Sequence, residues 1–408
     1  MRVQSHNKAF SQMPLVELLA RVAEKCGRVT QDESGKDEQV RAELLSAARE
    51  LVSELESPVE RLSRMVYLEP TLLAIVRAAI DWKLYSALVA DNGLPKGSTQ
   101  LAQECKIDAK LMSRSLKHLS AGGIVREVDV DRYAPRPITY LLCNPGAQGM
   151  VIDMSGMPQI VSNFPYFLKD RKYQNPTDKD DSPFMHAYDT KLHYFEWLNQ
   201  PGMEDRAQAF ANHMSFKDMD KKWYQMTDVK AIFDNPTDAE TVLMVDVGGN
   251  QGHDLVGFHK AYRDLPGRLV LQDLDAQISK IPPNTLPKAI EAAAHDFFTP
   301  QPIQGAKVYY LHMVLHDWPD SECIKILQNI VPAMKKGFSK ILLNEVVIPD
   351  RDANWFCTSL DVLMMLAHAA QERTEGDWRA LLGKAGLEIK KIWDCEGNPQ
   401  KVIEVELM

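Results

Sequence analysis

The sequence LHDWPD contains a histidine, His316, followed directly by an aspartate, Asp317. It directly follows the apolar run AKVYYLHMV, which predicts a β-strand. In α/β proteins, ligands bind beyond the carboxyl ends of the strands, and a histidine there can act as a general base because its ordinary pKa lies near neutrality. A lone histidine with an adjacent aspartate is also common as a structural feature or a helix cap. His316 and Asp317 therefore predict a general base, with a structural role as the open alternative.

Two glutamates could assist such a base. Glu345 lies in the strand-like run KILLNEVV, and Glu372 lies in QERTEGDW, which follows the apolar helical run LDVLMMLAHAA. A carboxylate beside the Nδ1 atom of His316 would fix the tautomer of the imidazole and stabilise its charged form. We therefore expect the three side chains to converge in the folded chain.

The segment MVDVGGNQGHD has the residue types that bind a nucleotide-type cofactor. An apolar run ends at Asp246, and Gly248, Gly249 and Gly252 then predict a tight turn before a helix that begins near His253. Glycines permit positive φ angles and let a ligand approach the backbone closely. The alternative is a tight turn with a purely structural role.

A second acidic residue, Asp273, ends the next strand-like run, RLVLQD, 27 residues after Asp246. A carboxylate there can accept hydrogen bonds from a ribose diol. The glycine spacing G-G-x-x-G differs from the G-x-G-x-x-G of dinucleotide binders, and Asp246 would repel a pyrophosphate but suits the ammonium of a methionine group. The segment therefore favours S-adenosyl-L-methionine over a dinucleotide as the cofactor.

The elements that must position these residues alternate between strand and helix. From Thr241 onward, six runs predict strands: TVLMVDV, RLVLQDL, AKVYYLHMV, KILLNEVV, EIKKIW and KVIEVEL. Such alternation predicts a largely parallel α/β sheet over residues 239–408. Only DCEGNPQ separates the last two runs, so we expect a terminal antiparallel hairpin.

Residues 67–144 predict a winged-helix-like domain. The run TLLAIVRAAIDWKLYSALV predicts one apolar helix. The signals after it are helix caps at Ser98, Thr99 and Asp108, a helix end at Gly122–Gly123, and a β-like run from Ile124 to Val130 that turns at Asp131. A winged helix can bind DNA, but the candidate recognition helix AKLMSRSLKHLS is only weakly basic, so we expect no nucleic-acid partner.

Residues 1–66 predict two amphipathic helices separated by a polar loop from Thr30 to Glu38. Their apolar faces have no obvious partner in the local sequence. We expect them to pack on another domain or on a second subunit as a dimerisation segment, with packing within the chain as the alternative.

Residues 145–238 are rich in aromatic residues and methionine. Most of these side chains must belong to the core, because large apolar groups are mostly buried. Their density just before the α/β domain also suits a pocket for a flat aromatic ligand.

The chain has 408 residues, of which 45% are hydrophobic and 25% charged, and a formal net charge of −9. This balance argues against a general polyanion binder, which needs clustered Lys and Arg. The six cysteines form no CxxC pair, and no apolar run reaches the roughly 18–20 residues of a membrane helix. We therefore expect a cytoplasmic protein of two to three domains, without a metal site and without membrane association.

The motifs DVGGNQGHD, LQDL, HDFF, LHDWPD, NEVVIPD and QERTEGDW, in this order and spacing, resemble those of S-adenosylmethionine-dependent O-methyltransferases of the caffeic-acid and aflatoxin-pathway type, especially fungal ones. The resemblance extends from about Tyr67 to the C-terminus. It implies a Rossmann-like domain with a mostly parallel seven-stranded sheet, a dimerising winged-helix domain, and methylation of a phenolic hydroxyl on an aromatic secondary metabolite of polyketide type.

The resemblance also implies roles for individual residues. His316 would be the base, flanked by Glu345 and Glu372. The cofactor would be held by Asp246, Gly248, Gly249, Asp273, Leu274, Asp296, Phe297 and His312. The small aromatic substrate would contact Phe210, Met214, Trp223 and Asp317.

The chain departs from the family pattern at three positions. Asn250 stands where many members have a third glycine, and asparagine tolerates a left-handed backbone. Ala211 replaces the usual asparagine of F-N-x-x-M. His312 stands where relatives carry arginine or lysine, which places the affinity for the cofactor, or its orientation, in question.

Two other functions fit the same motifs. Some proteins of this fold no longer methylate and instead catalyse dehydrations or pericyclic reactions, with the bound sulfonium serving as a positive charge. Those proteins generally alter the base region, whereas His316, Glu345 and Glu372 are all present here. We expect methyl transfer, with such a pericyclase or dehydratase as the first alternative and a winged-helix regulator with a vestigial enzyme domain as the second.

Overall fold

The computed structural model describes residues 15–31, 38–216, 221–233, 238–283, 285–394 and 398–408. The chain forms two units, which divide between Cys143 and Asn144. The finer predicted divisions, after residues 66 and 238, stay predictions.

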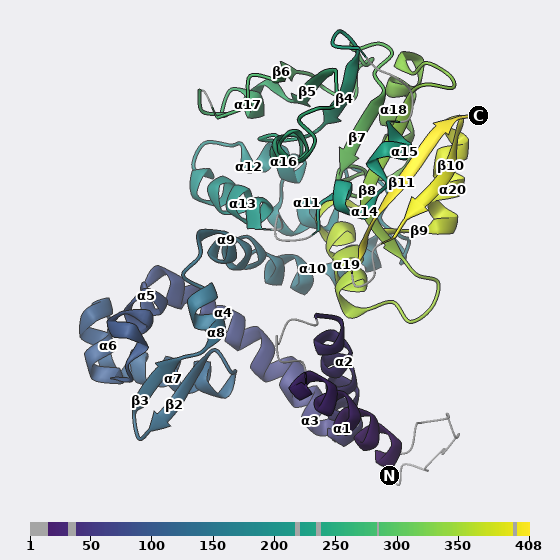
Figure 1. The fold of residues 1–408 in the computed structure, drawn as a ribbon. Helices are drawn as coiled ribbons and strands as arrows, with labels where there is room; N and C mark the ends of the chain where they lie inside the picture. Colours follow the sequence, from purple (N-terminus) through teal and green to yellow (C-terminus); the bar gives the residue numbers. More distant parts are fainter. Residues whose placement is uncertain (1–14, 32–37, 217–220, 234–237, 284, 395–397) are drawn as a thin grey trace. The chain divides into compact units, whose positions relative to one another are not determined.

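The first unit begins with helices whose apolar residues recur at helical spacing. They are α1 Leu15–Gln31, α2 Glu38–Leu55, α3 Pro58–Ser63, the π-helical turn η1 Arg64–Leu68, α4 Glu69–Asp81 and α5 Leu84–Val89 (Figure 1). Most of the loop predicted between the first two helices, residues 32–37, lies outside the described residues. The single helix predicted over TLLAIVRAAIDWKLYSALV is wrong, because Lys83 adopts a left-handed backbone with φ 57° and separates α4 from α5.

A small winged-helix-like region follows in the same unit. Its elements are η2 Asp91–Gly93, β1 Lys96–Gly97, α6 Ser98–Cys105, α7 Ala109–Ala121, β2 Val125–Asp129, β3 Arg132–Pro135 and α8 Pro137–Leu141. The cap predicted for α7 is confirmed, because Asp108 accepts a hydrogen bond from the Leu111 backbone N–H at 2.8 Å. The caps predicted for α6 are wrong: Gly97 is the N-cap, and the Ser98 hydroxyl instead donates to Asp131 at 2.7 Å.

The second unit opens with short helices rich in aromatic residues. They are α9 Pro145–Met154, α10 Met157–Asp170, α11 Pro183–Tyr188, α12 Tyr194–Leu198, α13 Glu204–Phe216, α14 Trp223–Met226 and α15 Val229–Ile232. Helices α9 and α13 cross closely at Gly149, where a Cβ atom would lie 2.6 Å from the carbonyl oxygen of Ala209. This crossing fixes the position of α13.

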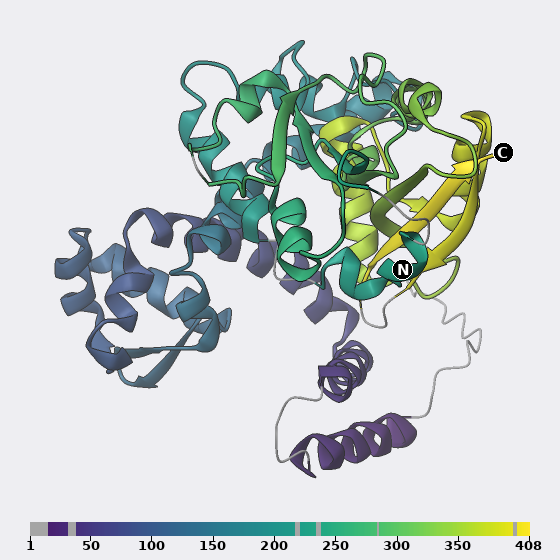
Figure 2. The ribbon, with the colours of Figure 1, turned by 45° about the horizontal axis from the view of Figure 1, so that its top comes forward.

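A mostly parallel sheet forms the rest of the second unit. Its strands, in sheet order, are β10 Leu387–Trp393, β11 Gln400–Leu407, β8 Lys340–Ile348, β7 Val308–His312, β4 Val242–Val247, β5 Arg268–Asp273 and β6 Ile290–Ala294. Among these described strands, β11 alone runs opposite to the direction of the others, and a short strand, β9 (Arg373–Thr374), pairs with β8. The predicted seven-stranded sheet and terminal hairpin are confirmed, and Figure 1 and Figure 2 show the yellow hairpin at one edge.

The six strand-like runs of the sequence do not include β6. Its residues, IEAAA, are three alanines, a glutamate and an isoleucine, and alanine and glutamate are uncommon in strands. The strand lies at the sheet edge and pairs with β5 alone, so tertiary pairing determines its conformation.

Helices cover both faces of the sheet, because successive residues of a strand point to opposite faces. The remaining helices are α16 His253–Ala261, α17 Asp275–Ile278, η4 Leu315–Asp317, α18 Asp320–Ile330, η5 Val331–Ala333, α19 Trp355–His368 and α20 Glu375–Lys384. Val245 and Leu311 lie in a core cluster with residues of α18 and α20, whereas Met244 and Tyr310 lie in another with residues of α14, α15 and α16. Packing on both faces holds the strand ends in fixed positions.

We expect Gly149→Ala to lower the free energy of unfolding of the second unit by about 1–3 kcal/mol, because the added methyl group forces α9 and α13 apart. Urea unfolding followed by tryptophan fluorescence measures the change. Gly383→Ala in α20 is the matched control, since a Cβ atom there meets only Met408, at 3.8 Å. The control should keep its stability or gain about 0.5–1 kcal/mol. Equal stabilities of the two variants would contradict the close crossing.

Candidate active site

Three neighbouring strands end at the same edge of the sheet and carry predicted site residues. Asp246 lies near the end of β4, Asp273 ends β5, and His312 ends β7. Strand β4 has β5 on one side and β7 on the other, so the strand order switches direction at β4. The loops that leave such strands open a crevice in which α/β sheets bind ligands.

His316 lies in the turn η4 directly after β7 and is almost fully buried. Its Nδ1 atom lies 2.7 Å from a carboxylate oxygen of Glu372. Glu345, on β8, accepts hydrogen bonds from the backbone N–H groups of Val314 and Leu315, at 3.1 and 2.9 Å. One polar atom from each of the three side chains lies within 4.8 Å of the others. The fold therefore brings the predicted trio together, with Glu372 on the imidazole and Glu345 on the turn that carries it.

A buried arginine holds Glu372 beside this turn. Arg373, which the sequence reasoning missed, is fully buried, and its guanidinium donates to the carbonyl oxygens of Leu315 and Trp318 at 3.1 and 3.0 Å. It also donates to the Asp320 carboxylate at 2.8 Å. The segment that carries Glu372 is thus fastened to η4 on both sides of His316.

Burial and charge shift the acidity of these groups. Burial alone would lower the pKa of His316, but the carboxylates of Asp317 and Glu372 outweigh it and raise that pKa to about 9. Burial raises the pKa of Glu345 to about 7, although the nearby imidazole opposes the shift. One oxygen of Glu345 and one of Glu372 are buried without a hydrogen-bond partner in the described part of the chain. The protonated imidazole is therefore the favoured form of His316 at neutral pH.

Two histidines that the sequence reasoning missed lie beyond Asp317. The Oδ1 atom of Asp317 lies 3.4 Å from His316 Nε2 and 3.7 Å from His368 Nε2. His368 Nδ1 in turn lies 3.3 Å from His193 Nε2. The two residues are lone histidines, in KLHYFEW and MLAHAA, and carry no spacing signal, so only the fold reveals the row.

The turn after β4 forms a cradle around the Asp246 carboxylate. Gly248 and Gly252 have φ angles of 77° and 76°, and Asn250 has a φ of 51°, as a left-handed turn requires. A Cβ atom at Gly249 would lie 2.5 Å from the carboxylate of Asp246. Any side chain at this position would therefore fill the cradle.

Asp246 is the carboxyl group in this cradle that lacks a full set of hydrogen-bond partners among the described residues. It is buried, and its Oδ2 atom has no hydrogen-bond partner among the residues that the structure describes. Burial, reinforced by the charge of Asp254, raises the pKa of Asp246 well above its ordinary value. An ammonium group would supply both a donor and a compensating charge. The cradle and this carboxylate therefore fit the methionine group of S-adenosylmethionine.

The residues predicted for the ribose and adenine lie beside the same turn. Asp273 accepts hydrogen bonds from a backbone N–H of the glycine turn and from that of Leu274, both at 2.8 Å. Phe297 lies near Gly248, since a Cβ atom on that glycine would be 3.7 Å from its ring. The Asp296 carboxylate accepts a backbone hydrogen bond at 2.9 Å from two residues further along. The structure thus places these residues around one turn.

His312, which stands where the family resemblance predicts arginine or lysine, is paired with a carboxylate. Its Nδ1 atom lies 2.6 Å from the Asp254 carboxylate, and its Nε2 atom lies 3.2 Å from the side-chain oxygen of Gln400. Burial alone would lower the pKa of His312, but Asp254 outweighs it and raises that pKa. The imidazole in turn lowers the pKa of Asp254 against the effect of its burial. The pairing therefore favours a charged imidazole whose charge is offset by Asp254, a carboxylate that the sequence reasoning missed.

Phe210 and Met214, the residues predicted to contact the substrate, lie one turn apart on α13. The Phe210 ring packs against Tyr194 and Phe195, with ring centroids 6.0 Å apart in each case. Tyr194 also meets His368 edge-on at 5.5 Å. An aromatic cluster therefore connects α13 to the histidine row beside the base.

Trp223 packs in the core rather than in this aromatic cluster. It is fully buried, and its ring lies 5.0 Å from that of Phe258 and 5.4 Å from that of Tyr310. Its position is explained by packing in the core against the sheet and α16.

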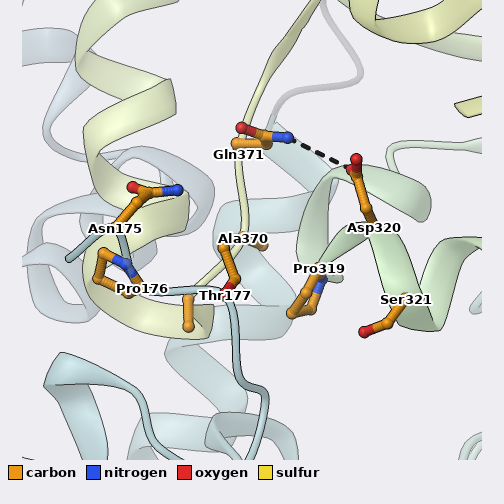
Figure 3. Close-up of a pocket in the computed structure, with 9 residues that line it drawn as sticks. Asn175, Pro176, Thr177, Pro319, Asp320, Ser321, Ala370 and Gln371 are labelled. Carbon is orange, nitrogen blue, oxygen red and sulfur yellow. Dashed lines mark hydrogen bonds between the residues drawn. The ribbon is translucent and has the colours of Figure 1, made fainter. Parts of the chain in front are cut away.

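A cavity of about 230 Å³ opens beside the segment between His368 and Glu372 (Figure 3). It is lined by Asn175, Pro176, Thr177, Pro319, Asp320, Ser321, Ala369, Ala370 and Gln371. A hydrogen bond from Gln371 to Asp320, 3.3 Å long, crosses part of it. None of the predicted site residues lines this cavity, so the chemistry is assigned to the strand ends instead.

Comparisons with known proteins place this site in a family. Residues 179–388 match the model of an O-methyltransferase domain. The "Methyltransferase cfoC" of Aspergillus candidus is 36% identical over 384 residues, which cover 92% of this chain and 93% of that protein. The "O-methyltransferase lepI" of Aspergillus flavus is 33% identical, with 86% and 90% covered.

Solved structures share the fold of this chain. A structure titled "A Pericyclic Reaction enzyme" superposes with a TM-score of 0.86 at 30% identity and covers 96% of this chain and 100% of its own. A second, "The structure of LepI complex with SAM", gives a TM-score of 0.86 at 31% identity with the same coverage.

We expect binding of S-adenosylmethionine to release protons. The raised pKa favours the protonated carboxyl of Asp246 in the protein alone, whereas an ammonium beside it favours the carboxylate, so affinity should rise with pH. Calorimetric titration in two buffers of different ionisation enthalpy measures the number of protons released. Asp246→Asn should release fewer protons and bind roughly tenfold more weakly, because a charged hydrogen bond is lost. Equal release from the variant and the unaltered protein would contradict this role of Asp246.

Proposed function

The chain belongs to the O-methyltransferase family and depends on S-adenosylmethionine, and we propose that it methylates a phenolic hydroxyl with His316 as the base. The observation that carries this proposal is the buried contact of 2.7 Å between His316 Nδ1 and Glu372, just beyond β7. When bound, S-adenosylmethionine supplies the methyl group from its sulfonium. The residues proposed to hold it are Asp246, Gly248, Gly249, Asp273, Leu274, Asp296, Phe297 and His312.

The geometry assigns different tasks to the two nitrogen atoms of His316. Nδ1–H donates to Glu372, which fixes the tautomer, so Nε2 is the atom that can accept a proton. The phenol O–H bond breaks as its proton passes to Nε2, and Glu372 and Asp317 stabilise the resulting imidazolium. Glu345 keeps the turn in place through the two backbone N–H groups that it accepts.

The substrate that suits this arrangement is a small aromatic molecule with a phenolic hydroxyl, of polyketide type. Phe210 and Met214 on α13 are proposed to contact its ring, and Asp317 to contact its polar edge. Apolar walls exclude water, which strengthens the electrostatic effects on the reacting oxygen.

We expect the rate of methyl transfer to rise with pH. The base must be neutral, and its pKa of about 9 means that the neutral fraction grows about tenfold per pH unit below that value. A bound cation disfavours the imidazolium, so with saturating cofactor the ascending limb of kcat/KM should end below pH 9. His316→Ala should lose kcat by roughly 10²–10⁴-fold and lose the limb. The exposed His186 supplies the control, His186→Gln, which should keep both. An unchanged limb in His316→Ala would show that another group is the base.

A second function is favoured by a specific observation. The raised pKa makes His316 a cationic donor at neutral pH, which could activate a carbonyl without removing a proton. The match to "A Pericyclic Reaction enzyme" agrees with such chemistry. Formation of S-adenosylhomocysteine with a product heavier by one methyl group supports transfer, whereas a substrate that changes without gaining mass while the cofactor stays intact supports a pericyclase or dehydratase.

We also propose a homodimer formed through the N-terminal helices. Exposed apolar side chains run along α1 to η1: Leu15, Val16, Leu19, Leu45, Val52, Leu55, Val59, Leu62, Met65, Val66 and Tyr67. An apolar surface of this extent is typical of an interaction site.

Light scattering after size exclusion should give twice the mass of one chain. Val59→Asp combined with Leu62→Asp should shift the protein toward one chain, because two buried charges would oppose association. Leu94→Asp, an equally exposed apolar position in the first unit, is the control. A monomer of the unaltered chain would exclude the dimer.

A cytoplasmic location is likewise a proposal. Cys395 lies outside the described residues, and the five cysteines within them are free thiols, as a reducing compartment would keep them. In the described chain, no helix combines the length and apolarity needed to span a membrane.

A further inference from the structure

Two buried histidines take no part in the mechanism above, although they lie beside its base. His193 precedes α12, and His368 ends α19 just before a left-handed residue, Ala369. His368 Nε2 faces the Asp317 carboxylate at 3.7 Å, and the same oxygen atom faces His316 Nε2 at 3.4 Å. Asp317 therefore lies between the two imidazoles.

The neighbours of the pair determine which nitrogen atoms carry protons. His368 Nδ1 lies 3.3 Å from His193 Nε2, so one of these nitrogens donates to the other. The Asp317 carboxylate on the far side favours a proton on His368 Nε2, because a lone pair there would face a negative oxygen. His368 Nδ1 then accepts from His193, and the 3.7 Å between His368 Nε2 and Asp317 makes that contact a charge–dipole interaction rather than a hydrogen bond.

Aromatic rings hold this row in place. His193 stacks on Trp318 with ring centroids 4.8 Å apart and an angle of 8° between the planes, and Trp318 directly follows Asp317 in the chain. His368 packs against Phe195, with ring centroids 5.1 Å apart. Packing of this kind leaves the imidazoles little freedom to turn.

Burial keeps both imidazoles neutral. It lowers the pKa of His193 to about 4, and it lowers the pKa of His368 well below its ordinary value with help from the charge of His316. The other charged groups around the row and the base are Lys179, Asp180, Glu196, Glu345, Glu372 and Arg373. A neutral donor can hold the Asp317 carboxylate without cancelling its charge, as a lysine or arginine would.

We propose that His368 and His193 are positioning residues for the methyl-transfer reaction, a neutral donor pair that holds the Asp317 carboxylate beside Nε2 of His316. This inference rests on the proposed function, because it takes His316 to be the base. Through Asp317, the two histidines influence the orientation of His316 Nε2. They also influence how strongly the Asp317 charge raises the pKa of His316. They do so without touching the reacting atoms.

Two substitutions at each histidine separate the polar contact with Asp317 from packing. His368→Gln keeps an N–H donor near the position of Nε2 and loses the ring, whereas His368→Phe keeps a ring and loses the donor. We expect His368→Gln to keep kcat within about threefold and His368→Phe to lose roughly 10–100-fold, by analogy with residues that orient metal ligands. His193→Gln and His193→Phe should follow the same order. A packing role alone predicts the opposite order.

The pH profile provides a readout that packing would not move. Without the donor, more of the Asp317 charge acts on His316, so the ascending limb of kcat/KM in His368→Phe should move to higher pH by roughly half to one unit. The titration of the ¹³Cε1 signal of His316 should show the same upward shift in the absence of any substrate. His186→Gln removes an exposed imidazole from the same unit and should leave both measurements unchanged.

The outcomes distinguish this inference from the function on which it rests. Failure of the unaltered chain to form S-adenosylhomocysteine with any phenol overturns the proposed function and, with it, the role of the pair. Transfer by the unaltered chain, with His368→Phe as active as His368→Gln or with no shift in the His316 titration, overturns the inference alone. Melting curves establish that each variant folds.

Discussion

The His316 imidazole is buried together with the carboxylates of Glu345 and Glu372. The arrangement of the elements at this edge of the sheet depends on this shared burial. Removing such charges from water costs several kcal/mol for each ion unless partners compensate closely. The partners come from three places: β8 carries Glu345, the segment after α19 carries Glu372, and β7 leads into the turn with His316. The buried guanidinium of Arg373 joins the segment after α19 to the turn that follows β7. The position of this turn and the pKa of His316 therefore depend on the same contacts.

The same principle applies on the cofactor side of the sheet edge. Asp246 is buried without a partner for one oxygen in the described chain, and its neighbour Asp254 is already paired with His312. The edge therefore presents a buried carboxyl group where the cationic cofactor is proposed to bind and a buried imidazole where the phenol is proposed to lose its proton. One carboxylate, Asp317, lies at the boundary between the base and the histidine row.

The sequence predicts the fold from strand-like runs that end near polar, potentially functional residues. It also predicts the trio His316, Glu345 and Glu372, which the structure brings together. It does not predict β6, whose alanines prefer helices, nor the break at Lys83, since a left-handed lysine leaves no local signal. The partners of His312 and Asp317 are also absent from the predictions. Asp254 and His368 acquire their roles only through contacts between distant elements, and no spacing in the sequence encodes such contacts.

The hydrogen bonds of Arg373 and Glu345 to η4 and the residue before it restrict local unfolding of this turn. The backbone amides of Val314 and Leu315 donate to Glu345, and the Leu315 carbonyl accepts from Arg373, so neither end of this peptide segment can fray alone. Amide hydrogen exchange at these two positions must then report the opening of a unit that includes β9 and the turn together. The turn that carries His316 should then open with the sheet as one cooperative block, although it lies outside the strands.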